Sequence, residues 1–270
     1  MPKPLTVPEA SLALACAVLA LAAAFGAPLA QPAAYHQLAD QRELLGLPFA
    51  MDVLSNLPFL LAGLAGLWLL RGRPGLLAGR PERKLATLFF AGLACTAAGS
   101  AFYHWQPDDA GLVVDRLAMV LPFAGLLGLA AAGISSRAGI AVSAGVLLAG
   151  PVAVGLWAAS GNLLPWAMLQ AGGMVLVACL ACAGTRPGAL AVRWWPVLLA
   201  YALAKLLELG DQAVFEATAG WVSGHSLKHV VAALAAWPVL AALWALPESG
   251  QNAAGSQTST ATTGRLARNA

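Results

Sequence analysis

The chain has 270 residues, of which 60% are hydrophobic and only 10% are charged. Soluble domains carry about 25% charged residues, so this composition excludes an ordinary soluble domain and indicates a membrane protein. The net charge of +3 is small and gives no sign of nucleic-acid binding.

Long apolar stretches recur along the chain between short polar joints. A helix needs about 20 largely apolar residues to cross roughly 30 Å of hydrocarbon, and backbone groups in lipid must be hydrogen-bonded within the protein. We therefore expect eight transmembrane helices, at residues 10–30, 53–70, 85–105, 112–133, 139–158, 165–183, 195–213 and 225–246. The predicted fold class is an all-α polytopic membrane protein, with a seven-transmembrane-helix core bundle and one extra N-terminal transmembrane helix.

The expected helices divide the chain into four parts. The extra helix occupies residues 1–31, a loop on the outer side follows at 32–52, the seven-helix core spans 53–246, and a polar tail occupies 247–270. This tail has no apolar face and is predicted to be disordered and cytoplasmic. The first apolar segment is also compatible with a cleaved signal peptide, because a small-residue site follows it.

Basic residues are concentrated on one side of this topology. That side holds Lys3, Arg71, Arg73, Arg80, Arg83, Lys84, Arg137, Arg186, Arg193, Arg265 and Arg268. The opposite side holds little more than Arg42 and Arg116. Because Lys and Arg favour cytoplasmic loops, both termini are predicted to be cytoplasmic. The Ala-, Leu- and Gly-rich composition suggests a bacterial inner membrane, with the opposite, outer side facing the periplasm.

Polar residues with metal-binding or catalytic chemistry fall at helix ends on the outer side. They are Asp52, Ser55, Ser100, His104, Asp115, His225 and His229. Residues four apart on a helix share one face, so Ser100 stacks with His104 and His225 with His229. A helical histidine pair at this spacing can bind zinc. With His104 as third ligand, the fourth position stays open, as in catalytic zinc sites.

The neighbours of these histidines suggest hydrolysis. Asp115 is separated from His104 by one short polar turn, so the two side chains can approach each other across an antiparallel helix pair. Zinc makes water a nucleophile at neutral pH, and a carboxylate such as Asp115 can accept the proton. Ser100 either donates a hydrogen bond to the oxyanion formed at a carbonyl or bonds to its own helix. Ser55 and Asp52 are possible partners that orient the ligands.

Charged residues on the seventh expected helix form a second polar group. Because charges within a membrane are costly, we expect Lys205 and Glu208 to pair with each other. Asp211 is expected nearer the outer side, as a possible partner of a histidine. Lys228 lies between two of the histidines in sequence and is expected to point elsewhere, towards the headgroups.

The order of these polar residues resembles a known family. Ser100 and His104, then Asp115, and finally His225 and His229 match the spacing of the alkaline ceramidase family, within the CREST group of membrane hydrolases. The segment D-V-L-S-N-L-P-F, at residues 52–59, is similar to the serine-asparagine start of that family's first core helix. The resemblance extends over most of the chain.

The resemblance implies a seven-helix bundle in which His104, His225 and His229 hold a zinc ion. It also implies hydrolysis of the amide of ceramide, which releases a sphingoid base and a fatty acid. By position, Asp115 would be the base and Ser100 the partner of the oxyanion.

Two features depart from the family pattern. One is the extra N-terminal helix. The other is the acidic, tryptophan-containing segment that binds calcium in eukaryotic members, which has no clear match here. His36, Asp40 and Glu43 either replace that segment or form an outer cap. The resemblance therefore implies a zinc ion but leaves a requirement for calcium doubtful. It also leaves the substrate open between ceramide and another membrane lipid amide.

Two classes of function remain open at this point. One is a zinc-dependent membrane amidase that hydrolyses the N-acyl bond of ceramide or a related lipid amide. The other is a non-enzymatic protein, either receptor-like with a structural zinc ion or a metal carrier. Asp115 favours the enzyme, because a structural site gains little from a base. A carrier would place acidic or histidine residues through the membrane rather than on one side.

Overall fold

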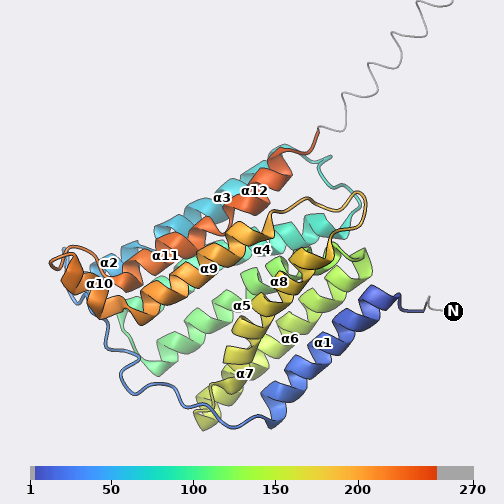
Figure 1. The fold of residues 1–270 in the computed structure, drawn as a ribbon. Coiled ribbons are helices and arrows are strands. Elements are labelled where there is room, and N and C mark those ends of the chain that lie inside the picture. The colour runs from blue at the N-terminus through green and yellow to red at the C-terminus, as the bar shows by residue number, and fades with distance from the viewer. Residues whose placement is uncertain (1–3, 248–270) are drawn as a thin grey trace, which may run out of the picture.

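The computed structural model describes residues 4–247 of the chain (Figure 1). Within this range the chain forms helices and isolated β-bridges but no strand, which confirms the expected all-α membrane fold. The helices are α1 (Val7–Phe25), α2 (Ala50–Leu54), α3 (Leu57–Gly72), α4 (Pro81–Trp105), α5 (Asp109–Ala132), α6 (Ser136–Ser160), α7 (Leu164–Ala167), the π-helical turn η1 (Met168–Gly172), α8 (Gly173–Ala183), α9 (Trp194–Leu209), α10 (Asp211–Ala217), α11 (Gly224–Leu234) and α12 (Trp237–Trp244). Residues 1–3 and 248–270 lie outside the described residues, and with them Lys3, Arg265, Arg268 and nearly all of the expected polar tail.

Several helices are long and apolar enough to cross a membrane. They are Val7–Phe25, Ala50–Gly72, Pro81–Trp105, Asp109–Ala132, Ser136–Ser160, Leu164–Ala183 and Gly224–Trp244. The remaining expected span, at 195–213, contains α9, which has 16 residues and ends at Leu209. A helix of 16 residues is about 24 Å long at 1.5 Å per residue, which is less than the hydrocarbon thickness.

Helices α4 and α5 form the centre of the bundle. α4 packs against α3 and α5, α5 packs against α6, and α9 packs against α11. Phe90 of α4, Ala131 of α5 and Val239 of α12 are fully buried members of one hydrophobic core. The N-terminal helix α1 lies at the margin of this bundle, where it contacts α7 and η1 (Figure 1).

Contacts between loops define the two ends of the bundle. At one end, Glu82 pairs with Arg80 and Arg186, so the basic loops gather there. At the other end, the backbone N–H of Ala39 donates to Asp211 Oδ2 at 2.9 Å, and α4 reaches His104 in its last turn. We call these the basic end and the histidine end. Their separation matches the expected division between basic and histidine-bearing sides of the bundle.

Candidate metal centre

Three buried histidines meet at the histidine end. His104 comes from α4, whereas His225 and His229 come from the first two turns of α11. One ligand atom of each ring lies within 4.8 Å of the ligand atoms of the other two. The Nε2 atoms of His104 and His225 are 3.1 Å apart. These side chains can hold one metal ion together, as the sequence predicted.

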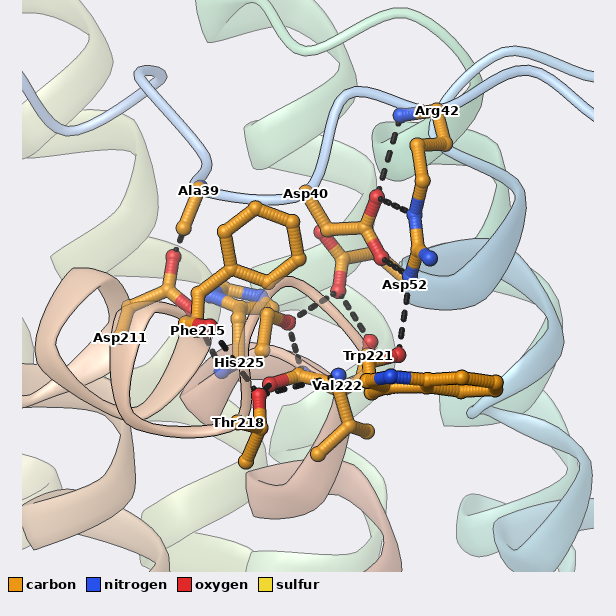
Figure 2. Close-up of polar contacts among 12 residues, drawn as sticks. Ala39, Asp40, Arg42, Asp52, Asp211, Phe215, Thr218, Trp221, Val222 and His225 are labelled. Atoms are coloured by element: carbon orange, nitrogen blue, oxygen red, sulfur yellow. Dashed lines mark hydrogen bonds and ion pairs between the residues drawn. The ribbon is translucent and has the colours of Figure 1, made fainter.

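The first turn of α11 is fixed by capping contacts. The Ser223 hydroxyl accepts a hydrogen bond from the backbone N–H of Ser226 at 2.9 Å, and Asp211 Oδ1 accepts one from the backbone N–H of His225 at 2.7 Å. Figure 2 shows Asp211 between Ala39 and His225. A Cβ at residue 224 would lie 2.8 Å from the Cα of Asp211, so only Gly224 permits this close approach. The backbone that carries His225 is therefore held against the end of α9.

Close contact between α4 and α5 places Asp115 near the histidines. A Cβ at residue 99 would lie 2.8 Å from the Cβ of Ala118, so Gly99 lets the two helices approach. Ser100 is buried beside this contact and hydrogen-bonds the carboxylate of Asp115. The Asp115 Oδ1 atom is buried and has no hydrogen-bond partner among the described residues. Ser100 lies one turn before His104 on α4, so its partner Asp115, which carries one free oxygen, is held by the residue next to a metal ligand on that helix face.

The donor set fits zinc. A tetrahedral ion with Zn–N distances of about 2.0–2.1 Å separates two ligand nitrogens by about 3.3–3.4 Å. The observed 3.1 Å between His104 Nε2 and His225 Nε2 is close to that value. The group contains three histidines, and Asp115 lies outside it. Three protein ligands and an open fourth position are typical of catalytic rather than structural zinc sites.

Ser55 determines which nitrogen of His229 is available to a metal. The Ser55 hydroxyl is 3.0 Å from the backbone carbonyl of Asp52 and 2.8 Å from His229 Nδ1. A hydroxyl that donates to the carbonyl must accept from Nδ1–H, and this tautomer leaves the lone pair of Nε2 free. Partners of this kind fix the tautomer and the ring orientation of metal ligands.

Replacing Ser55 by Ala is expected to weaken zinc binding by about 10- to 100-fold, because the His229 ring loses the group that orients it. Titration of the purified protein with zinc against a competing chelator measures this change. Ser143→Ala is a matched control, since Ser143 is a buried serine of α6. Equal zinc affinities of Ser55→Ala and wild type would show that the contact does not support the site.

Asp52 and Asp211 lie next to the metal centre without touching an imidazole. The Asp52 carboxylate accepts hydrogen bonds from the hydroxyls of Ser226 at 2.6 Å and Ser223 at 3.2 Å. Asp211 accepts from backbone N–H groups, including that of His225. Both aspartates therefore hold the start of α11 rather than orient a histidine ring directly.

Lys228 lies differently from the expectation. Its Nζ donates to Glu208 Oε1 at 2.7 Å, while Lys205 donates to Glu208 Oε2 at 2.7 Å. The expected pair of Lys205 and Glu208 is present, but Lys228 joins it instead of reaching towards headgroups. The reason is that α11 packs against α9, so the half-buried carboxylate of Glu208 is within reach of Lys228.

The segment between α1 and α2 covers the histidine end. His36 Nδ1 lies 3.0 Å from the Tyr103 hydroxyl, and His36 Nε2 lies 3.0 Å from Asp109. Burial raises the pKa of Asp40, but hydrogen bonds from Arg42 outweigh it and lower this pKa below its ordinary value. Since Asp40 and His36 already have partners, these contacts favour the outer cap over a calcium site.

Arg116 is a buried residue of this region that the sequence did not single out. It follows Asp115 in α5 and is only 2% exposed, although it was expected as an ordinary charge at a helix start. Its guanidinium lies 3.9 Å from the centre of the Trp157 ring. Sequence spacing alone carries no signal for this burial, because it depends on α6 and on the covering segment.

Two apolar grooves lie on the bundle. The smaller, of about 230 Å³, runs between α2, α3 and α4 and includes Asn56 and Ala101 in its lining. Ala101 follows Ser100 and Asn56 follows Ser55 in the sequence, but neither serine lines the groove itself. The larger, of about 680 Å³, lies between α1, α6 and α8, and no histidine lines it.

Comparison with known proteins found no matching family model, no matching curated protein and no matching solved structure. The family resemblance therefore rests on the residues and spacings of the chain itself. The structure itself shows an all-helical architecture and long apolar helices among the described residues. It also shows a buried three-histidine group that could hold a metal ion.

Proposed function

We propose that this protein is a zinc-dependent membrane amidase that hydrolyses the N-acyl bond of ceramide or a related lipid amide and releases a fatty acid. One observation carries the proposal. Asp115 is buried with a free Oδ1 atom, and its hydrogen-bond partner Ser100 lies one turn before His104, a member of the three-histidine group. A structural metal site has no use for such a carboxylate.

His104, His225 and His229 would hold the ion. When bound, zinc supplies a Lewis acid that makes water nucleophilic at neutral pH. Asp115 accepts a proton from the attacking water at Oδ1, as the water oxygen bonds to the carbonyl carbon. Asp115 then donates this proton to the amide nitrogen as the C–N bond breaks, so the products are a carboxylic acid and an amine.

Ser100 acts in this proposal mainly on Asp115. A hydroxyl has one proton, and the Ser100 proton is directed at the Asp115 carboxylate. This contact keeps one oxygen of Asp115 engaged and leaves Oδ1 without a hydrogen-bond partner. The oxyanion role suggested by the family pattern requires the hydroxyl to leave Asp115 during the reaction.

The location of the site suits a substrate from the membrane. The centre lies at one end of long apolar helices, and a groove between α3 and α4, the helix that carries His104, is lined mainly by Leu, Val and Ala side chains. An acyl chain in this groove would place its carbonyl near the polar end of the bundle. We further propose a bacterial inner membrane, with the basic end cytoplasmic and the histidine end periplasmic.

Zinc-loaded protein is expected to release fatty acid from at least one member of a panel of ceramides and other N-acyl lipids. Mass spectrometry of the products measures this release, and a chelator should abolish it while added zinc restores it. Analogues in which an N-alkyl chain replaces the N-acyl chain provide the negative control. If the folded, zinc-loaded protein cleaves no member of the panel, a receptor-like protein with structural zinc becomes the better explanation.

A further inference from the structure

Arg116 is a buried cation beside the candidate site, and no carboxylate of the described residues forms an ion pair with it. The nearest carboxylate along the chain, Asp115, is hydrogen-bonded to Ser100. Arg116 itself is 2% exposed, and its Nε and Nη1 atoms are buried without a hydrogen-bond acceptor. Arginine does not lose its proton in proteins, so this positive charge is permanent.

The guanidinium is held firmly in place by neutral groups. Its Nη2 atom donates to Gln31 Oε1 at 2.6 Å, and Tyr35 also hydrogen-bonds it. The Cζ atom of Arg116 lies 3.9 Å from the centre of the Trp157 ring and 5.6 Å from the centre of the Tyr35 ring. Stacking and these hydrogen bonds orient the cation, but none of these partners carries a negative charge, and a buried charge without an ion-pair partner is unfavourable.

Nearby charges offset Arg116 only in part, because Asp115 attracts it through space without forming an ion pair. Lys205 and Lys228 share the single carboxylate of Glu208, so this neighbouring group has one more cation than anions. Buried charges are normally paired, and unpaired ones mark binding sites within membrane proteins. A missing anion would satisfy both the charge and the two free nitrogens of Arg116.

The depth of Arg116 suits the polar end of a lipid. Residue 116 lies seven positions into α5, which begins at Asp109, or about 10 Å from the helix start. The headgroup layer is about 5–8 Å thick on each side of the hydrocarbon core. Arg116 is therefore near the boundary where lipid carboxylates and phosphates lie.

We propose that Arg116 binds an oxyanion group of a membrane lipid, either the carboxylate of a fatty acid or the phosphate of a headgroup. Arginine is well suited to both, because its planar donors match the geometry of these anions. Where the ligand is the released fatty acid, the inference rests on the proposed hydrolysis. The anion site itself does not depend on it.

The test compares charged and neutral lipids that share the same chains. Full-length protein, stripped of metal with a chelator so that zinc cannot attract the anion, is titrated with oleate and oleamide. Phosphatidic acid and diacylglycerol form the second pair, and native mass spectrometry measures binding. We expect the anion of at least one pair to bind about 10- to 100-fold more tightly than its neutral partner, the gain typical of hydrogen bonds to a charged group. A larger preference for oleate over oleamide indicates a fatty-acid carboxylate as the ligand, and a larger preference for phosphatidic acid over diacylglycerol indicates a headgroup phosphate.

Variants assign this preference to Arg116. Arg116→Gln is expected to abolish it, and Arg116→Lys, which keeps the charge, to retain part of it. Arg42→Gln is the matched control, since Arg42 is an exposed arginine at the same end that is already paired with Asp40. No preference in the wild type, or a full preference in folded Arg116→Gln, would overturn the inference. Neither outcome depends on whether the protein hydrolyses amides.

Discussion

Replacing His229 by Ala is expected to remove most of the bound zinc. His229 supplies one of three nitrogens, and complete zinc sites of four ligands bind with about 10–16 kcal/mol. The loss of one ligand should therefore weaken binding by about two orders of magnitude or more. Elemental analysis of the purified, dialysed protein gives the number of ions per chain, which should fall from near one to a small fraction.

His36→Ala is the matched control for this experiment. His36 is the only other histidine of the chain and lies at the same end, but its ring contacts Tyr103 and Asp109 instead of the three-histidine group. This variant should keep its zinc. Full zinc occupancy in folded His229→Ala would eliminate the site, and with it the basis for the proposed hydrolysis.

Apolar length alone was sufficient to predict the helical fold. Segments such as Pro81–Trp105 and Ser136–Ser160 are continuous, apolar and long enough to cross a membrane, so each predicts a helix with little ambiguity. The exception is α9, which ends at Leu209 although the prediction continued to residue 213. Asp211 begins α10 and holds the backbone of His225, and this tertiary contact gives no hydropathy signal.

The convergence of the three histidines was also predictable, because it depends on two simple properties. Helical spacing places His225 and His229 on one face, and alternating helix directions bring His104 to the same end. Both properties survive errors of several residues in the helix boundaries. The contact of Ser55 with His229 follows similarly, since Ser55 lies near the start of the helix expected at 53–70, at that same end.

Contacts that depend on helix rotation could not be predicted in this way. Lys228 turns towards Glu208 because α11 packs on α9 with that face inward, and nothing in the spacing of the histidines fixes this rotation. Arg116 contacts Trp157 and Gln31, and both of these residues are far from it in the sequence. Hydropathy treats both cations as surface charges, because it cannot register a partner from another element.

Asp115→Asn is expected to lower the turnover of the preferred lipid amide by about 100- to 10,000-fold, the range typical of general acid–base catalysis. The amide keeps the size of the side chain, and its oxygen can still accept the hydrogen bond from Ser100. What it lacks is an oxygen basic enough to take a proton from water. Zinc content should remain that of the wild type, because Asp115 lies outside the three-histidine group.

Asp108→Asn provides a matched change on the same helix. Asp108 caps the start of α5, where its side chain accepts a hydrogen bond from the backbone N–H of Gly111 at 2.7 Å. Asparagine caps helices about as well as aspartate, so this variant should retain its turnover. Hydrolysis rates of the three zinc-loaded proteins, measured on one N-acyl lipid, give the comparison. If Asp115→Asn cleaves this lipid as fast as the wild type does, Asp115 is not the base, and the free Oδ1 atom has another role.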